Sequence, residues 1–229
     1  MDTDTTTAPS GTPSPHAMPR GLFVLSLLYG GMAVLAGFLA FKQVQLPFTD
    51  LAVEAGIFAF LILVVVSSTI AQVYGDATAR RLVWWGFLPL AVSAVLIFLV
   101  LSLPASPEML EYRASDLAAF ETVLSQTPRI MAAGPAAYLV SLLLNVWLFS
   151  RLRGKTSGEG TTTGLMIRGA IASALSQAID SVIFVTLAFY GEFDITNLLI
   201  GQVIAKVVLS LVLVPPLIAL FVRIARRLG

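Results

Sequence analysis

The sequence predicts an all-α integral membrane protein, folded as a six-transmembrane-helix bundle with both termini in the cytoplasm. Three observations lead to this fold class. Of the 229 residues, 57% are hydrophobic and only 12% are charged, whereas soluble domains carry about 25% charged residues. Six separate apolar runs are each long enough to cross a bilayer. The basic residues between these runs alternate from loop to loop, which an even number of spans explains.

The predicted spans follow a polar tail. Residues 1–20 are rich in Thr, Ser and Pro and cannot bury a core, which predicts a disordered cytoplasmic tail. The first apolar run is too long for a signal peptide and no cleavage site follows it, so we interpret it as a transmembrane helix. Within a membrane domain of residues 21–224, the expected spans are residues 22–41, 51–73, 82–103, 130–149, 165–190 and 198–222, followed by a short basic tail at 225–229.

Loop charges orient the bundle. With six spans, most basic residues fall on one side, and only Lys42 and Arg113 fall on the other. The positive-inside rule therefore places both termini in the cytoplasm. The residues on the basic side are Arg20, Arg80, Arg81, Arg151, Arg153, Lys155, Arg223, Arg226 and Arg227.

The long third loop, residues 104–128, contains a helix of its own. Ser115-Asp116 is a plausible helix start, and Leu117, Phe120 and Leu124 then recur at helical spacing. This pattern predicts an amphipathic helix that lies on the outer surface or caps the bundle.

Two charged residues lie at matching depths in the last two spans. Asp180 precedes Tyr190 and Lys206 follows Asn197 by similar intervals, which places each charge roughly 14–15 Å deep in a core about 30 Å thick. A lone charge there costs at least ~2.5–3.5 kcal/mol, so such residues pair or line a polar cavity. A structural ion pair is one interpretation. Because two desolvated charges seldom stabilise more than apolar packing does, a substrate site is favoured.

Further polar residues share helix faces with this pair. Ser and Gln side chains also join membrane helices without touching a substrate, and Glu54, near the outer boundary, could simply reach water. The fifth span carries Ser173, Ser176, Gln177 and Asp180 on one stripe that Phe184 extends; the sixth carries Gln202, Lys206 and Ser210; the fourth carries Tyr138, Ser141 and Asn145 after Arg129; and the second carries Ser68 and Gln72.

The sequence lacks the residues that several function classes require. There is no cysteine and a single histidine, His16, so disulfides, thiolate metal sites and multi-histidine metal sites are excluded. The sequence has no Gly-rich phosphate loop, no His-Glu-x-x-His and no Gly-x-Ser-x-Gly motif. No catalytic residues, cofactor or metal are therefore expected. Any transport is secondary, facilitated, or energised by another subunit.

Four segments carry a recognisable pattern in a fixed order. They are Val73-Tyr74-Gly75 with Ala79-Arg80-Arg81; Gln126 to Ile130 (QTPRI) with Ala137-Tyr138-Leu139 and Ser141; Arg168 to Phe184 (RGAIASALSQAIDSVIF); and Gly201-Gln202 with Lys206. Together they resemble the queuosine precursor transporter family, the VUT (vitamin-uptake-like) group, over about residues 22–222. The chain departs from that pattern at Ser68, Gln72 and Asn145, where the family carries carboxylates.

The resemblance implies a bacterial inner-membrane importer of a 7-deazaguanine, such as 7-cyano-7-deazaguanine or 7-aminomethyl-7-deazaguanine. It implies a membrane-embedded protein with a small-molecule substrate, no nucleic-acid partner and no obligatory ATPase partner. A guanine-like base offers two adjacent donors that one carboxylate, Asp180, can accept together. Gln177, Gln202 or Lys206 would then donate to O6, while Phe184 or Tyr138 stacks on the ring. The substrate-binding residues expected on this basis are Asp180, Lys206, Gln177, Gln202, Ser176, Arg129, Tyr138, Asn145, Phe184 and Gln72.

Three other classes remain open from the residues alone. Substrate-binding subunits of energy-coupling-factor vitamin transporters have a similar size and composition but need a partner ATPase module. A membrane enzyme would use Asp180 and Lys206 as acid and base. A structural or assembly factor would bind no small molecule.

Overall fold

The computed structural model describes residues 18–153 and 162–228, and it describes no side chain at residues 142–143, 145–153 and 162–173. The predicted tail of residues 1–20 lies almost entirely outside this part. In chain order the elements are α1 (Arg20–Leu39), β1 (Gln43–Gln45), β2 (Ala52–Glu54), α2 (Ile57–Tyr74), α3 (Asp76–Ser102), α4 (Pro107–Tyr112), α5 (Ala114–Arg153), α6 (Thr162–Phe189), α7 (Thr196–Val212) and α8 (Val214–Arg227).

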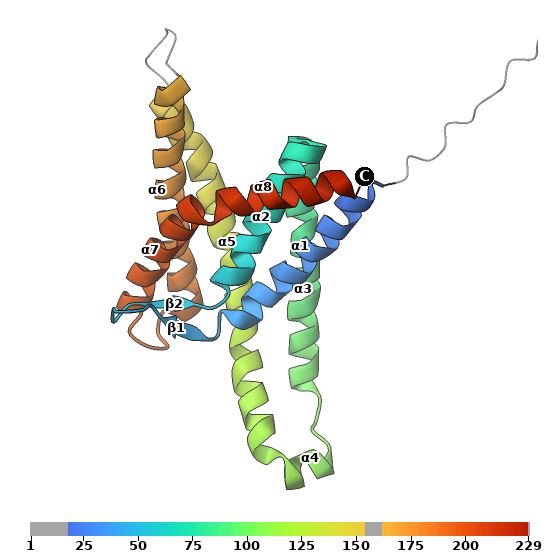
Figure 1. The fold of residues 1–229 in the computed structure, drawn as a ribbon. Helices are drawn as coiled ribbons and strands as arrows, with labels where there is room; N and C mark the ends of the chain where they lie inside the picture. The colour runs from blue at the N-terminus through green and yellow to red at the C-terminus, as the bar shows by residue number, and fades with distance from the viewer. Residues whose placement is uncertain (1–17, 154–161, 229) are drawn as a thin grey trace, which may run out of the picture.

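Apolar packing joins the helices into one bundle. Leu25 and Val66 lie in a buried cluster shared by α1, α2 and α3. Ile130, Val185 and Leu198 lie in a second cluster shared by α5, α6 and α7. Figure 1 shows α5 and α6 side by side and α8 lying across α2 and α1. The long helices α3 and α5 extend past the hairpin to α4 (Figure 1).

The start of α1, the turn between α2 and α3, and the end of α8 meet at one end of the bundle. A Cβ at Gly21 would lie 2.9 Å from the carbonyl oxygen of Ala225 and would overlap the Tyr74 hydroxyl. The first and last described helices therefore begin and end beside each other (Figure 1).

Within the described residues, α1, α2 and α3 are each long and apolar enough to cross a membrane, and α7 with α8 passes the same test only as a bent pair. The prediction of an uninterrupted sixth helix over residues 198–222 is wrong. The chain bends by 49° between α7 and α8. Pro215 and Pro216 follow this bend in the first turn of α8, where proline supplies no N–H to the preceding helical turn. The helix α8 continues to Arg227, so residues 225–227 of the expected basic tail are helical.

A short antiparallel hairpin precedes α2, where the sequence predicted that the second span had already begun. Val44 pairs with Val53, and both belong to a small apolar cluster with Ile57. The backbone of α7 packs directly on this hairpin, because a Cβ at Gly201 would overlap the carbonyl oxygen of Ala52.

The amphipathic segment of the third loop is helical, but it is no separate surface helix. It forms the first part of α5, which continues through Pro128 and Pro135. Membrane helices tolerate internal prolines when neighbouring groups satisfy the freed backbone. The N-terminal part of α5 therefore extends the fourth predicted span directly.

Candidate functional site

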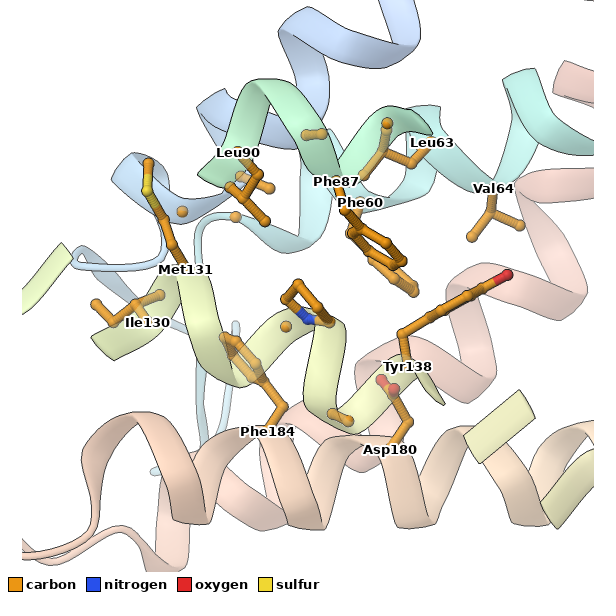
Figure 2. A pocket seen from close by; sticks show the side chains of 18 of the residues that line it. Phe60, Leu63, Val64, Phe87, Leu90, Ile130, Met131, Tyr138, Asp180 and Phe184 are labelled. Carbon is orange, nitrogen blue, oxygen red and sulfur yellow. The ribbon is translucent and has the colours of Figure 1, made fainter. Parts of the chain in front are cut away.

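A cavity lies among α1, α2, α3, α5, α6 and α7, and its wall is mostly apolar. Aromatic rings come from three sides: Phe60 of α2, Phe87 of α3 and Phe184 of α6. Figure 2 shows Tyr138 and Asp180 beside these rings, at the same side of the cavity. An apolar pocket with a few convergent polar groups is the usual form of a small-molecule site.

Asp180 and Lys206 meet at this cavity. The Lys206 ammonium donates to Asp180 Oδ2 at 2.5 Å, and the Ser141 hydroxyl donates to Asp180 Oδ1 at 3.2 Å. The exposed fractions of Asp180 and Lys206 are only 6% and 5%. The prediction that these two charges lie close together is confirmed, and a short turn joins their helices, α6 and α7.

The ammonium of Lys206 also lies over aromatic rings. Its Nζ is 4.4 Å from the centroid of Phe60 and 5.7 Å from that of Phe184. A ring face attracts a cation with roughly 0.5–2 kcal/mol, more when water is excluded. These contacts fix the ammonium between the carboxylate and the apolar wall.

Glu54 is a second buried carboxylate at the cavity, and sequence reasoning did not place it in the site. Its exposed fraction is 3%, so the interpretation that it reaches water is wrong. Gln202 of α7, itself fully buried, donates from Nε2 to Glu54 Oε1 at 2.6 Å and accepts from the Glu54 N–H at 3.2 Å. A carboxylate just before an apolar helix was the available signal, but hydropathy alone does not distinguish an inward side chain from one at the surface.

Two aromatic residues from the predicted set line the cavity. Phe184 and Tyr138 are both wall residues, and the ring of Tyr138 packs edge-on against Phe87 with centroids 6.1 Å apart. Tyr29, Phe60 and Phe87 complete the aromatic part of the wall. Their apolar segments gave no sequence signal that separated them from ordinary membrane-facing or packing residues.

The other predicted site residues lie elsewhere. Gln177 Oε1 accepts from Ser210 Oγ at 2.6 Å, which ties α6 to α7 beside the cavity. Ser176 is buried and does not line the cavity wall. Gln72 is exposed near the end of α2, and the side chain of Asn145 lies outside the described residues.

Arg129 lies at the end of the bundle where α6 turns into α7, and it binds that turn. Its guanidinium donates to the carbonyl oxygens of Leu187 at 2.9 Å and Tyr190 at 2.7 Å. It also contacts Glu192 Oε1 at 3.0 Å. The structure therefore brings Arg129 to a loop and not to Asp180.

The apolar helices and this buried polar site define a class of helical membrane proteins with an internal cavity, and comparison with known proteins identifies the family. The family model described as "Putative vitamin uptake transporter" matches residues 54–220. The chain belongs to this family, and its long apolar helices are those of a multi-pass membrane protein.

One relative is the "Probable queuosine precursor transporter" of Bacillus subtilis (strain 168), which is 29% identical over 146 residues. The match covers 62% of this chain and 60% of the relative, less than two thirds of that protein's length. No solved structure matches the chain.

Proposed function

We propose that this protein imports a queuosine precursor, 7-cyano-7-deazaguanine or 7-aminomethyl-7-deazaguanine, across the bacterial inner membrane without changing it chemically. The observation that carries the proposal is the buried Asp180 carboxylate at a cavity walled by aromatic rings. The name of the Bacillus subtilis relative supports the same substrate class.

Residues 21–224 form the transporter domain in this proposal, with six spans and both termini in the cytoplasm. The proximity of Gly21 to Ala225 supports an even number of crossings, because it puts the beginning and end of the domain at the same end. The segregation of basic residues supports the cytoplasm as that side. In this topology α7 is the last span, and α8 lies along the inner surface of the membrane.

Asp180 is the group that recognises the base. A carboxylate has about four lone-pair positions, so Asp180 can accept the N1–H and the 2-amino group while Lys206 and Ser141 stay bound. Lys206 is positioned to donate to O6 as well, because an ammonium carries three donors. Tyr138 or Phe184 stacks on the ring, an interaction that contributes about 1–3 kcal/mol per base.

The remaining predicted residues act around this centre. Gln202 holds Glu54, Gln177 joins α6 to α7 through Ser210, and Arg129 fixes the outer turn. Ser176 is buried on the polar face of α6, outside the cavity wall. We assign no contact with the base to Gln72 or Asn145.

Deletion of the gene in a host that cannot synthesise the precursor tests the function directly. We expect queuosine-modified tRNA to disappear when the host depends on supplied precursor, and to return with the wild-type gene. Normal modification after deletion would contradict the proposal.

Purified protein in proteoliposomes separates this function from its main alternative. We expect uptake of the labelled base by this protein alone. If uptake required an added ATPase module and ATP, the protein would instead be the substrate-binding subunit of an energy-coupling-factor transporter.

A further inference from the structure

Glu54 has one carboxylate oxygen that the fold leaves without a regular hydrogen bond. Gln202 occupies Oε1, whereas Oε2 has no hydrogen-bond partner in the described part of the chain. The N–H groups of Gly56 and Ile57, at the start of α2, face the carboxylate and favour its charged form. Glu54 is nevertheless almost completely buried and belongs to the cavity wall. A buried carboxylate oxygen without a hydrogen bond of regular geometry costs free energy, and a proton bound to Oε2 would lower that cost.

The charges at the cavity do not balance when every group is ionised. Among the described wall residues, the ionisable groups are Glu54, Asp180, Lys206, Tyr29 and Tyr138. The ammonium of Lys206 is hydrogen-bonded to Asp180, and the two tyrosines are neutral at physiological pH. One negative charge therefore remains, and it belongs to the carboxylate that has no ammonium bound to it.

The packing around Glu54 leaves little room for a larger compensating ion. A Cβ at Gly56 would lie 2.6 Å from Glu54 Oε2 and would overlap the carbonyl oxygen of Ala36 in α1. No cluster of His, Cys, Asp and Glu that could hold a metal ion occurs in the described residues. Among the described residues, Lys206 of α7 is the charged side chain that attracts the Glu54 carboxylate. Lys42, in the turn before the hairpin, is exposed to solvent. A proton is the one cation that needs no further space.

The Glu54 carboxylate is suited to binding and releasing a proton. Glu54 lies on β2, before the spanning helix α2 begins. Burial raises the pKa of Glu54 to about 7, and Lys206 and the Gln202 hydrogen bond oppose part of that effect. A group with such a pKa gains or loses its proton readily near neutral pH.

We propose that Glu54 is the proton-binding residue of this transporter and that each molecule of neutral base enters together with one proton. The proposal rests on the transport function argued above and adds the driving force to it. A proton from the outer solution binds Glu54 Oε2, neutralises the cavity as the base binds Asp180, and leaves to the cytoplasm when the base is released. The Gln202 amide holds the carboxylate in both states, as its Nε2 donates to Oε1, the oxygen that does not take the proton.

The test uses the full-length protein in proteoliposomes with labelled 7-cyano-7-deazaguanine, which is a neutral base, and with the membrane potential clamped at zero. Exchange of internal for external base is measured first, because it needs no gradient. We then expect an inward gradient of about one pH unit to concentrate the base about tenfold, since a tenfold proton ratio supports a tenfold ratio of a co-transported neutral solute. A pH dye inside the vesicles should report one proton for each base.

Glu54→Gln keeps the shape and the Gln202 contact but cannot carry the proton. We expect this variant to retain measurable exchange while its gradient-driven accumulation falls about tenfold, to a ratio near one. Asp50→Asn, an exposed carboxylate change on the same hairpin, should accumulate like wild type. If Glu54→Gln does not fold, Gln202→Leu takes its place in the test, because losing the donor to Oε1 should move the pH midpoint of uptake upward.

Wild-type exchange without any response to the pH gradient would overturn proton coupling and leave the transport function intact. Accumulation by Glu54→Gln, an unshifted midpoint in Gln202→Leu, or accumulation driven by a sodium gradient would also overturn it. Absence of exchange in the wild type would contradict the transport function itself.

Discussion

The ammonium of Lys206 lies 2.5 Å from the carboxylate of Asp180, and both side chains are almost completely shielded from solvent. Their helices leave the same tight turn, so the pair joins α6 to α7 at the cavity wall. Removing one partner of a buried pair strands the other charge and costs roughly 3–5 kcal/mol. The same pair is therefore a structural tie and, in the proposed function, the group that grips the base.

Double substitution separates these two roles. Asp180→Asn and Lys206→Met should each lower the free energy of unfolding by roughly 3–5 kcal/mol. The combined variant should recover most of the stability, because no isolated charge remains, and it should still be inactive, because Asn and Met cannot accept two adjacent donors. Melting curves and deazaguanine uptake are measured for the two single variants and the double variant. A double variant that transports normally would limit Asp180 to a structural role.

Tyr138 should contribute through its ring. Tyr138→Ala removes a stacking surface from the cavity wall and should weaken binding of the base by about 1–3 kcal/mol, seen as a higher KM for uptake. Tyr138→Phe keeps the ring and its edge contact with Phe87, so it should stay within a few fold of wild type. Equal losses in both variants would show that the hydroxyl, and not the ring, is the important group.

Gly201 should tolerate no side chain. Gly201→Ala would place a methyl group against the Ala52 carbonyl oxygen and push α7 away from the hairpin, so we expect a loss of about 1–3 kcal/mol in stability. Gly31→Ala in α1 is the matched control, since nothing lies within 4 Å of the position that a Cβ would take there. This control should be neutral or stabilising by up to about 1 kcal/mol. If Gly201→Ala and Gly31→Ala melted at the same temperature, the close packing of α7 on β2 would be contradicted.

Reporter fusions test the proposed topology. Fusions after Gly75, Ser106, Lys155 and Glu192 should report inside, outside, inside and outside, because basic residues concentrate at the predicted cytoplasmic ends. Activity of a periplasmic reporter at Lys155 would rule out six spans with cytoplasmic termini.

The stability of the protein should depend on pH through Glu54. The folded-state pKa is about 7, above the ordinary value of 4.5, so the folded protein binds more protons than the unfolded chain between these two values. The contribution of Glu54 is therefore most favourable below pH 4.5 and is lost as the pH rises to about 7. Across this range the melting temperature of wild type should fall by several degrees relative to Glu54→Gln. If the melting temperatures of the two proteins changed equally with pH, the raised pKa of Glu54 would be contradicted.

Parts of the site were predictable because their signals are local. Asp180 and Lys206 stand out in apolar segments of sufficient length, and the short turn between those segments brings the two charges close together. The cavity residues Phe60 and Phe87 were not predictable, because an aromatic ring in an apolar helix has the same local sequence whether it faces lipid, a neighbour or a cavity. Gln177 shares a helix face with Asp180, yet it turns to Ser210, which depends on where α7 packs.

Composition and the length of the apolar runs are properties of the chain alone, so they were enough to predict a helical membrane protein and the approach of Asp180 to Lys206. Packing between distant segments was needed to learn that the chain bends between α7 and α8, that residues 52–54 form a strand, and that Arg129 reaches the turn between α6 and α7. It also decided that Glu54 points inward to Gln202, 148 residues away in sequence. Contacts between distant segments set these features, because the free energy of a buried polar group depends on the partners that the fold brings to it.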